Sequence, residues 1–587
     1  MSQFDNNPSD TPLERPAPWE SGLLRVGFWI CAIAGCAGAA WWAVHVGKGV
    51  GWDQMNYHHY NVYAWLSGRM DADLAPAGMH TWINPLLYVP SYWMVNYLPP
   101  KITGAIFGGV AGLNLALLYA LACLSLRNVS PLIAATIALT SAIAGLSDPF
   151  FHSNLGSSDA DVFLSLHVIG SLCLICWAAS DELFGQWPEH WDKYRRESRR
   201  RWLYAAAAAL LGAAAGLKLT YFVYAIGMTV AVLVLWRGLR MNRRRFACFA
   251  AGGIGGYALT GGYWNWLMWS RYRNPFMPYF NDIFHSPWMM DFSFRDTRFP
   301  TQSFSAMLRF PFQWFAGEHP TSEGPFRIAI FAILFVIIPL VVVVAVMVTA
   351  NAVLVRFLSN WRHGDATINA HAGARKNQMT SPTLMWLVVI FWIVSYALWA
   401  WMFAIQRYLE PLALLAGWML WLLCDYLLTN RRMKWAVFSC LVAFSVLWMR
   451  GEDQGWRVPY GESWFGVKLP AAMQREHTLF VAIGGGPMSY LTAYLPASTT
   501  TVRFNDLTIP PNGPETDLTR RAARMIANHT GPLRSLSSIP PGMPLSDQDR
   551  AYLERFGLAQ VETACTQFAT DVTQFTTCPL LRRNPAP

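Results

Sequence analysis

Long apolar runs alternate with short polar segments from about residue 26 to residue 450. A bilayer core of about 30 Å needs roughly 20 apolar residues in a helix that crosses it. The pattern therefore predicts a membrane all-α fold of about eleven spanning helices, at 26–46, 103–126, 131–147, 162–180, 203–217, 219–236, 246–269, 327–352, 383–404, 408–428 and 435–450. Residues 1–25 are polar, lack the apolar core of a signal peptide, and are predicted to be a disordered tail.

The short loops between these runs differ in charge. Four of them carry basic blocks, which contain Lys193, Arg195, Arg196, Arg199, Arg200 and Arg201; Arg237, Arg240, Arg243, Arg244 and Arg245; Arg356, Arg362, Arg375 and Lys376; and Arg431, Arg432 and Lys434. Eleven crossings place all four blocks on one side, and Lys and Arg mark the cytoplasmic side. We therefore expect a cytoplasmic N-terminus and a C-terminus outside the cytoplasm.

The opposite side receives longer loops, at 47–102, 148–161 and 270–326, and the tail at 451–587. They are rich in Trp, Tyr, Pro and Asp, so the chemistry is expected on this outer face. Around Asn84 to Trp93 the first loop is apolar but interrupted by Pro85 and Pro90, which favours a helix in the membrane interface over another span.

The tail has the alternation of a small α/β domain. Apolar runs predict strands at Leu479 to Ile483, near Thr501 to Phe504 and around Leu533. Helices are expected at about 516–528 and after Ser546, which is suited to be an N-cap. Gly484 to Gly486 follow the first strand and can either cradle a phosphate or form a plain tight turn.

Composition narrows the class of protein. Of 587 residues, 54% are hydrophobic and 14% charged, whereas soluble chains carry about 25% charge. The net charge of +10 lies in short blocks between apolar runs, which suits an anionic membrane leaflet and not nucleic acid. Cys565 and Cys578 are the two cysteines in a polar region, and they can pair if that region is outside the cytoplasm.

The first outer loop begins with Gly51-Trp52-Asp53-Gln54-Met55-Asn56-Tyr57-His58-His59-Tyr60. Partial burial of Asp53 among aromatic rings would raise its pKa and make it a better base. The alternative is a helix N-cap, and the two roles are compatible. On the helix that follows, Asp53, Tyr57 and Tyr60 are expected on one face, with His58 and His59 at its flanks.

The second outer loop contains Asp148, His152, Asp159 and Asp161. Two carboxylates two residues apart, with a histidine nearby, can hold a divalent metal. They can equally cap the helix that starts near residue 160, or bind substrate hydroxyls.

Two cations lie near the outer ends of spans, away from the basic blocks. Lys218 interrupts an apolar hairpin, and Arg407 separates two apolar spans. Ionisable groups in such surroundings are costly unless paired, and are often functional. Arg407 can pair with Glu410, three residues on. Alternatively, Arg407 and Lys218 together form a clamp for an anionic lipid headgroup such as a polyprenyl phosphate.

The third outer loop interleaves aromatic residues with Asn, Asp and Arg, from Arg271 to His319. Such a composition suits carbohydrate, since sugar rings stack on aromatic side chains, but it also suits a loop anchored in the interface.

The acid after the first span, the long outer loops and the segment Gln406-Arg407-Tyr408-Leu409-Glu410-Pro411 together resemble the GT-C superfamily of polytopic glycosyltransferases. The nearest resemblance is to bacterial members that use polyprenyl-phosphate sugars, including mannosyltransferases. It covers residues 26–450 and implies a multi-pass protein of the bacterial inner membrane, with residues 451–587 as a periplasmic domain.

That resemblance implies an inverting transfer of a sugar from a polyprenyl-phosphate donor to a lipid or glycan acceptor. Asp53 would be the catalytic base, and Arg407 with Lys218 would bind the donor phosphate. Substrate contacts are assigned to Tyr57, His58, His59, Asp159, Asp161, Asn274 and Glu410. At the start of the first loop Asp53 stands alone where several such families have an adjacent acidic pair, so no metal or other cofactor is predicted.

Three other functions are compatible with a chain of many spans. A transporter or flippase would show repeated halves or broken midplane helices, and no internal repeat is visible. A ligase that moves a whole glycan from a lipid carrier is chemically close. A receptor role for the tail would make the spans an anchor, and eleven spans are excessive for that. An enzyme centred on Asp53 is expected to keep some activity when the tail is deleted.

Overall fold

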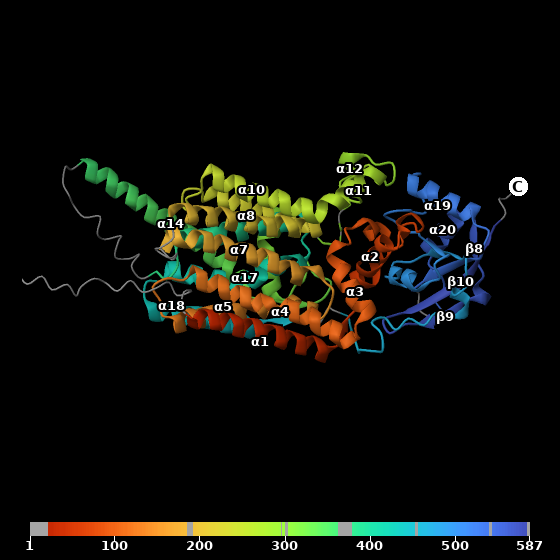
Figure 1. Ribbon diagram of the computed structural model, residues 1–587, viewed down its shortest axis with the longest axis horizontal. Coiled ribbons are helices and arrows are strands. Elements are labelled where there is room, and N and C mark those ends of the chain that lie inside the picture. The colour runs from red at the N-terminus through yellow and green to blue at the C-terminus, as the bar shows by residue number, and fades with distance from the viewer. Residues whose placement is uncertain are drawn as a thin grey trace, which may run out of the picture.

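The computed structural model describes residues 22–184, 192–294, 296, 298–299, 303–361, 378–451, 456–538 and 543–583. A long helical bundle occupies one side of the molecule and a sheet-containing unit the other (Figure 1). The predicted tail at 1–25 falls mostly outside the described residues, as do Arg362, Arg375 and Lys376 of the third basic block.

Every predicted span coincides with helical structure. The bundle consists of α1 (Gly22–Val46), α4 (Pro100–Ser125), α5 (Pro131–Leu146), α7 (Ala160–Phe184), α8 (Lys193–Leu217), α9 (Phe222–Val234), α10 (Arg243–Tyr257) with α11 (Tyr263–Tyr272), α14 (Ile330–Trp361), α16 (Pro382–Met402), α17 (Glu410–Leu427) and α18 (Arg431–Trp448). Six helices within the described residues are long and apolar enough to cross a membrane, and two shorter ones are apolar. Helices α8, α10 and α18 begin with basic residues, which lowers their mean hydropathy. The prediction of a helical, multi-pass membrane fold is confirmed.

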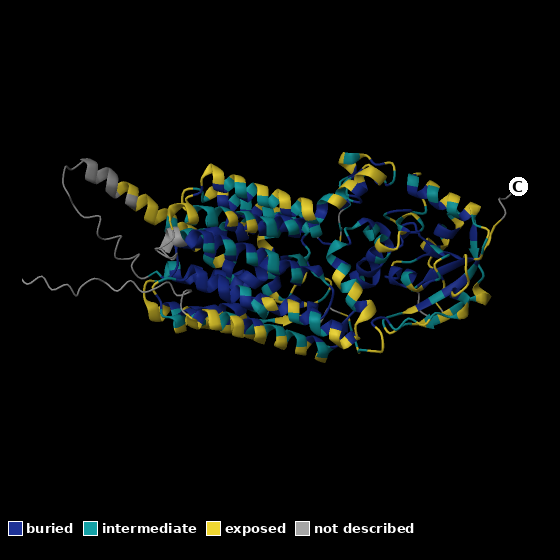
Figure 2. Cartoon of the chain, in the orientation of Figure 1, coloured by how far each residue is buried: buried dark blue, intermediate teal, exposed yellow. Residues whose placement is uncertain are grey.

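Small residues bring the helices close together. A Cβ atom added to Gly112 of α4 would lie 2.1 Å from the carbonyl oxygen of Gly35 in α1. Similarly, a Cβ atom on Gly252 of α10 would lie 2.0 Å from the carbonyl of Ala205 in α8. Such contacts let helices pack tightly in lipid, where the hydrophobic effect does not drive helix association. Helix α17 is buried from Glu410 to Asp425 and forms the centre of the bundle (Figure 2).

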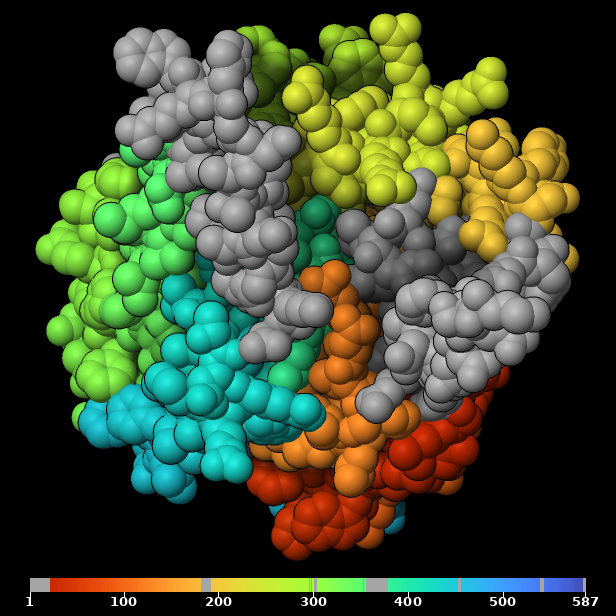
Figure 3. Space-filling view, turned by 90° about the vertical axis from the view of Figure 1, so that its left-hand side faces the viewer, coloured from red at the N-terminus to blue at the C-terminus, as the bar shows by residue number. Residues whose placement is uncertain are grey.

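The end of the bundle farthest from the sheet-containing unit carries the basic residues at the starts of α8, α10 and α18, and we call it the basic end (Figure 1). Figure 3 looks onto this end of the molecule. Two of these basic residues are buried in ion pairs. Arg245 donates to Glu197, with Nε 3.1 Å from Oε2, and Lys434 Nζ lies 2.7 Å from Asp425 Oδ1. Asp425 also accepts hydrogen bonds from the backbone of Met379 and Thr380. These two cations therefore hold helices together and are not available to a membrane surface.

The opposite end, which we call the site end, carries the loops between the bundle and the sheet-containing unit. Residues 47–102 form a π-helical turn, η2 (Gln54–His58), then α2 (His59–Leu66) and α3 (Val89–Tyr97). The 3-10 turns η3 (Arg69–Asp71), η4 (Gly78–Trp82) and η5 (Leu86–Tyr88) connect the two helices. Helix α3 leaves the rings of Trp93 and Tyr97 exposed, as expected for a helix in the interface. Further short helices of this end are α6 (Pro149–Asn154), α12 (Asn281–Phe284) and α13 (Phe304–Ala316).

The C-terminal unit is built on one mixed sheet. Strands β5 (Leu479–Ala482), β6 (Thr500–Arg503) and β7 (Leu533–Ser537) are parallel, with β5 in the middle. Strand β10 (Gln574–Arg582) is antiparallel to β7 and also pairs with β8 (Leu558–Gln560) and β9 (Thr566–Ala569). Helices α19 (Asp517–Asn528) and α20 (Asp547–Arg555) complete it, with Ser546 as the N-cap of α20.

The predicted strands and helices of this unit are therefore confirmed, whereas β8, β9 and β10 were not predicted. Residues 484–486 form no helix N-terminus, because the segment after them is the 3-10 turn η10 (Ser489–Tyr494). Cys565 and Cys578 form a disulfide. Short two-residue ladders join β1 (Lys48–Gly49) to β4 (Arg457–Val458) and β2 (Phe326–Arg327) to β3 (Arg450–Gly451).

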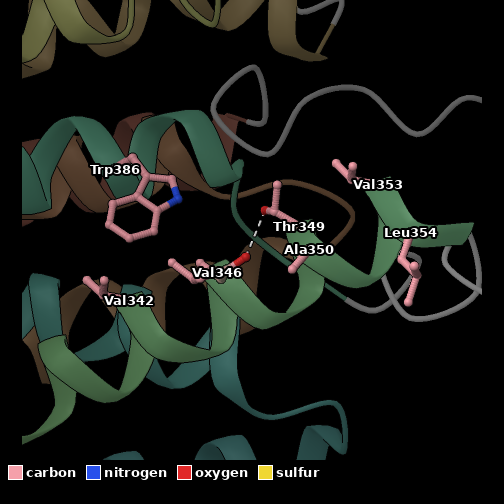
Figure 4. A pocket seen from close by; sticks show the side chains of 8 residues that line it. Val342, Val346, Thr349, Ala350, Val353, Leu354 and Trp386 are labelled. Atoms are coloured by element: carbon pink, nitrogen blue, oxygen red, sulfur yellow. Dashed lines mark hydrogen bonds between the residues drawn. The ribbon is translucent and has the colours of Figure 1, made fainter. Parts of the chain in front are cut away.

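A hollow of about 840 Å³ lies between α14 and the start of α16 (Figure 4). Its lining is apolar apart from Thr349, whose hydroxyl donates to the carbonyl of Ala345 in its own helix. Trp386 lines the hollow in the first turn of α16, whereas Arg407 follows the last turn of that helix. The hollow is therefore about one membrane thickness from Arg407, and it lacks the polar groups that chemistry requires.

Candidate active site

An ion pair joins the two residues that the sequence singled out as base and phosphate ligand. Arg407 Nη1 lies 2.9 Å from Asp53 Oδ2. Asp53 precedes the turn η2, and Arg407 belongs to the 3-10 turn η8 (Gln406–Leu409) that leads into α17. The Asp53 side chain makes no capping hydrogen bond, so the pairing with Arg407 replaces the alternative N-cap role. Arg407 pairs with Asp53 and not with Glu410, contrary to the structural alternative considered above.

The pair is sheltered on one side and open on the other. The side chain of Asp53 is 11% exposed, whereas that of Arg407 is 37% exposed. A molecule that approaches from outside therefore meets the guanidinium before the carboxylate.

The expectation of a raised pKa for Asp53 is wrong for this state. Burial alone would raise the pKa, but the adjacent Arg407 guanidinium and the more distant His58, His80 and Lys218 lower the pKa of Asp53 to about 2. Sequence reasoning included the burial but not the cation, because Arg407 lies more than 300 positions away in the chain.

The second cation, Lys218, lies beside the first. Its Nζ atom is 2.8 Å from both carboxylate oxygens of Asp161. Asp161 lies in the first turn of α7, where the helix dipole also favours a carboxylate. Lys218 lies 4.4 Å from the centroid of the Tyr408 ring, and the Arg407 guanidinium carbon lies 5.5 Å from the same centroid. Two acid–base pairs, Asp53–Arg407 and Asp161–Lys218, thus meet around one tyrosine.

Asp159 lies close to both pairs. Its Oδ2 atom accepts a hydrogen bond of 3.2 Å from Ser157 Oγ. Burial raises the pKa of Asp159, and Asp53 and Asp161 add to this, although Arg407 and Lys218 oppose it. The two carboxyl groups therefore differ, since Asp53 is the stronger acid and Asp159 the weaker one.

Within the described part of the chain, Asp53, His58 and Asp159 form the group that could hold a metal. One ligand atom from each lies within 4.8 Å of the other two. The guanidinium of Arg407, however, already supplies positive charge at Asp53. The other metal alternative, Asp159 and Asp161 with His152, is not formed, because Asp161 binds Lys218 and His152 bonds to the Leu146 carbonyl. Asp148 caps α6 through the amides of Phe150 and Phe151.

Aromatic rings form a wall beside Asp53. The ring of His58 stacks on Tyr88 at 3.8 Å, and its Nδ1 atom lies 2.9 Å from Ser158 Oγ. Tyr57 stacks on His80 at 5.2 Å. Burial lowers the pKa of His58 to about 3 and that of His80 to about 4, although Asp53 opposes both shifts, so both imidazoles are neutral at pH 7.

Sequence reasoning did not find His80, Tyr88, Ser158 or Tyr408. His80 and Tyr88 lie in irregular 3-10 turns that carry no periodic signal. Tyr408 could have been noticed as the direct neighbour of Arg407.

Two of the predicted site residues, Tyr60 and His59, point away from Asp53. Tyr60 donates to Asp73 Oδ2 at 3.1 Å, so it does not share a face with Asp53. The turn η2 has i to i+5 bonds, which rotate the following residues relative to an α-helix. His59 packs against Phe465, at 5.2 Å between ring centroids, and its Nε2 atom is 3.2 Å from Asn96 Nδ2. It therefore belongs to the contact with the C-terminal unit.

Two further predicted substrate ligands are buried. Asn274 is 0% exposed, and its side-chain amide bonds to Phe276, Tyr279 and Asn281 of its own loop. It shapes that loop and offers nothing to a substrate. Glu410 is 1% exposed, and neither carboxylate oxygen has a hydrogen-bond partner within the described residues.

The comparisons with known proteins give a distant likeness. No family model matches the chain, and no curated protein matches it. Two crystal structures of ArnT from Cupriavidus metallidurans, one bound to undecaprenyl phosphate and one in the apo state, are similar at 14% and 13% identity. Each comparison covers 94% of this chain and 97% or 98% of the other, with a TM-score of 0.46. At such values neither the activity nor the ligand of those proteins can be assigned to this chain.

Proposed function

We propose that this protein is an inverting glycosyltransferase of GT-C type. It takes a sugar from a polyprenyl-phosphate donor and transfers it to an acceptor hydroxyl at the outer face of the bacterial inner membrane. The observation that carries the proposal is the ion pair between Asp53 and Arg407, 2.9 Å apart at the site end. One group suits a base and the other suits a phosphate.

The donor phosphate competes with Asp53 for Arg407. Arg407 is the more exposed member of the pair, so an entering phosphate reaches it first and accepts its hydrogen bonds. Asp53 then loses its nearest cation while it stays buried. Burial without a cation raises the pKa of a carboxylate, so donor binding converts Asp53 from a weak base into a stronger one.

The transfer itself is a single displacement. Asp53 removes the proton from the acceptor hydroxyl, and the hydroxyl oxygen forms a bond to the anomeric carbon. The bond from that carbon to the phosphate oxygen breaks, and the electron pair leaves with the polyprenyl phosphate. Arg407 stabilises the charge that grows on this leaving group. Attack opposite the leaving group inverts the anomeric configuration, and the proton stays on Asp53 until it passes to water.

The neighbouring residues have supporting roles. Lys218 keeps one ammonium hydrogen that Asp161 does not use, and we assign it as a second ligand of the donor phosphate. Asp159, as the weaker acid, is suited to hydrogen-bond an acceptor hydroxyl. Tyr57 and the neutral ring of His58 provide a wall for the sugar.

The membrane location favours a lipid donor. Arginines mark the cytoplasmic side of membrane proteins, and from those at the basic end we infer that Asp53 and the C-terminal unit face the periplasm. Nucleotide sugars are not available there, so the sugar has to arrive on a lipid carrier. An anionic headgroup at the boundary of the bilayer would lie level with Arg407.

The proposal is tested with the purified full chain in lipid nanodiscs. It is incubated with a panel of radiolabelled polyprenyl-phosphate sugars, mannose first, and with a bacterial membrane lipid extract as acceptor. We expect one donor to be consumed, with equal amounts of glycosylated lipid and free polyprenyl phosphate and with an inverted anomeric centre by NMR. Consumption of no donor, or lipid movement across the membrane without bond cleavage, would overturn the proposal and would favour a flippase.

A further inference from the structure

Asn56 lies in the middle of the π-helical turn η2, between Asp53 and His58, and is 0% exposed. Its side-chain nitrogen donates to the carbonyl of Ala77 at 3.1 Å. Its side-chain oxygen accepts two hydrogen bonds of 3.1 Å, from Ser489 Oγ and from Arg503 Nη1. The single hydroxyl hydrogen of Ser489 is shared between this side-chain oxygen and the main-chain carbonyl of Asn56. Both donors belong to the C-terminal unit, so the turn after Asp53 is held from outside the membrane bundle.

Arg503 ends strand β6 and is 1% exposed. Within the described residues its guanidinium bonds only to oxygens of amide groups. Nη2 donates to the carbonyls of Gly484 and Gly486, at 3.1 Å and 2.8 Å, and Nη1 also donates to the carbonyl of Pro76 at 3.3 Å. A buried guanidinium without a carboxylate is costly, and this one joins three segments. The Gly-rich turn thus serves as a ligand of Arg503 through its carbonyl oxygens.

The same contact region includes backbone pairing. Leu74 forms a parallel bridge with Val502. Its amide donates to the carbonyl of Thr501 at 2.8 Å, and the amide of Arg503 donates to the carbonyl of Leu74 at 3.0 Å. Asp73 Oδ1 accepts from the amide of Thr501 at 2.9 Å and also pairs with Arg69. The first outer loop therefore continues the sheet of the C-terminal unit at its β6 edge.

These contacts explain how Asp53 can be held without a capping bond of its own. Its position follows from the turn η2, and the middle of that turn is fixed by Ser489 and Arg503. A displacement of a catalytic group by about 1 Å can cost about 100-fold in rate. Residues that do not touch a substrate can therefore still control turnover through Asn56.

We propose that Arg503 and Ser489 are positioning residues for the base Asp53, so that the C-terminal unit is part of the transferase and not an appended module. This inference rests on the proposed function. It also changes the expectation for tail deletion, because removal of the tail removes both donors to Asn56 and the strand that pairs with Leu74. The truncated chain is expected to lose transfer.

The test uses full-length variants and the donor that the wild type consumes. Arg503→Met is expected to lower kcat about 100-fold while KM for the donor stays within threefold, because Arg407 is untouched. Ser489→Ala is expected to lower kcat less, since Arg503 still holds the Asn56 side chain. Arg503→Lys, which keeps the charge and one donor group, is expected to recover part of the loss.

Arg534 provides a matched control. It is a buried arginine of the same sheet, 7% exposed, and it bonds to Thr577 in the neighbouring strand, away from Asn56. Arg534→Met is expected to lower the melting temperature about as much as Arg503→Met but to leave kcat within twofold.

Equal kcat losses in the two variants would mean a general effect on stability and would overturn the positioning role. Normal kcat in Arg503→Met would overturn it as well. Failure of the proposed function is distinguishable, because in that case the wild type consumes no donor or Asp53→Asn remains active.

Discussion

Arg407 and Asp53 form a salt bridge of 2.9 Å between the entrance to α17 and the first turn after α1. The pair neutralises two charges that would otherwise be costly near the bilayer. While the pair is intact, the proposed base Asp53 remains a weak base. It becomes a stronger base when a donor phosphate binds Arg407 in its place.

Replacement of Arg407 should change the pH dependence of the reaction. Against the effect of burial, Arg407 and, to a smaller extent, His58, His80 and Lys218 lower the pKa of Asp53 to about 2, so kcat/KM of the wild type should be flat from pH 8 down to pH 5. In Arg407→Gln the pKa of Asp53 rises above its usual value, and the acidic limb should move upward into the range above about pH 4. If the acidic limb of kcat/KM in Arg407→Gln lies at the same pH as in the wild type, Arg407 does not contact the group whose titration limits the reaction.

Arg407→Gln should also weaken donor use. Loss of a charged partner at a desolvated phosphate costs about 2 to 5 kcal/mol, so KM for the donor should rise by at least about 30-fold. Glu410→Gln is the matched control from the same helix entrance. Both carboxylate oxygens of Glu410 are buried and have no hydrogen-bond partner among the residues that the structure describes, so its amide variant should keep KM and kcat within twofold and should unfold at an equal or higher temperature. A large loss of turnover in Glu410→Gln would return Glu410 to the substrate-binding role that the sequence suggested.

Removal of metal ions tests whether the cluster of Asp53, His58 and Asp159 binds a metal or acts with Arg407 as its cation. Because Arg407 already lies at Asp53, transfer is expected to be unchanged after dialysis against EDTA. Activity that is lost on chelation and restored by Mg²⁺ or Mn²⁺, but not by buffer without added metal, would establish a metal requirement and contradict the prediction.

The basic end offers a prediction about stability. Lys434 and Asp425 are each 1% exposed in their side chains, and removal of one partner of such a pair costs about 3 to 5 kcal/mol. Lys434→Met should therefore lower the unfolding temperature in detergent strongly. The exposed pair of Arg520 and Asp517 is the control, since Arg520→Ala should change stability by less than about 1 kcal/mol. Equal decreases in unfolding temperature in the two variants would mean that the buried ion pair does not stabilise the fold more than the exposed one.

Periodicity alone predicted most of the fold. Apolar runs of sufficient length specify a helix in a bilayer whatever it packs against, and this explains why the spans agree so closely with the helices. In the C-terminal unit, β5, β6 and β7 were likewise predicted from their apolar runs. Strand β10 was not predicted, because it contains Thr576, Thr577, Cys578 and Pro579 and is specified by its partners β7, β8 and β9.

The candidate site was predicted in part. Asp53, Arg407, Lys218, Asp159, Asp161, Tyr57 and His58 were named from local chemistry, and the structure brings them together. Their pairing could not be predicted, because it depends on which helix ends are neighbours. Errors arose where local geometry departed from a regular helix, as at Tyr60 after the π-helical turn, and where an exposed role was assigned to a buried amide, as at Asn274.

The most direct test of the account combines transfer and lipid binding in Asp53→Asn. The account predicts that transfer falls by at least about 100-fold, while undecaprenyl phosphate, measured by native mass spectrometry, binds more tightly than to the wild type, because the carboxylate that competes for Arg407 is gone. Near-normal transfer, or weaker binding of undecaprenyl phosphate in a folded Asp53→Asn protein, would contradict it.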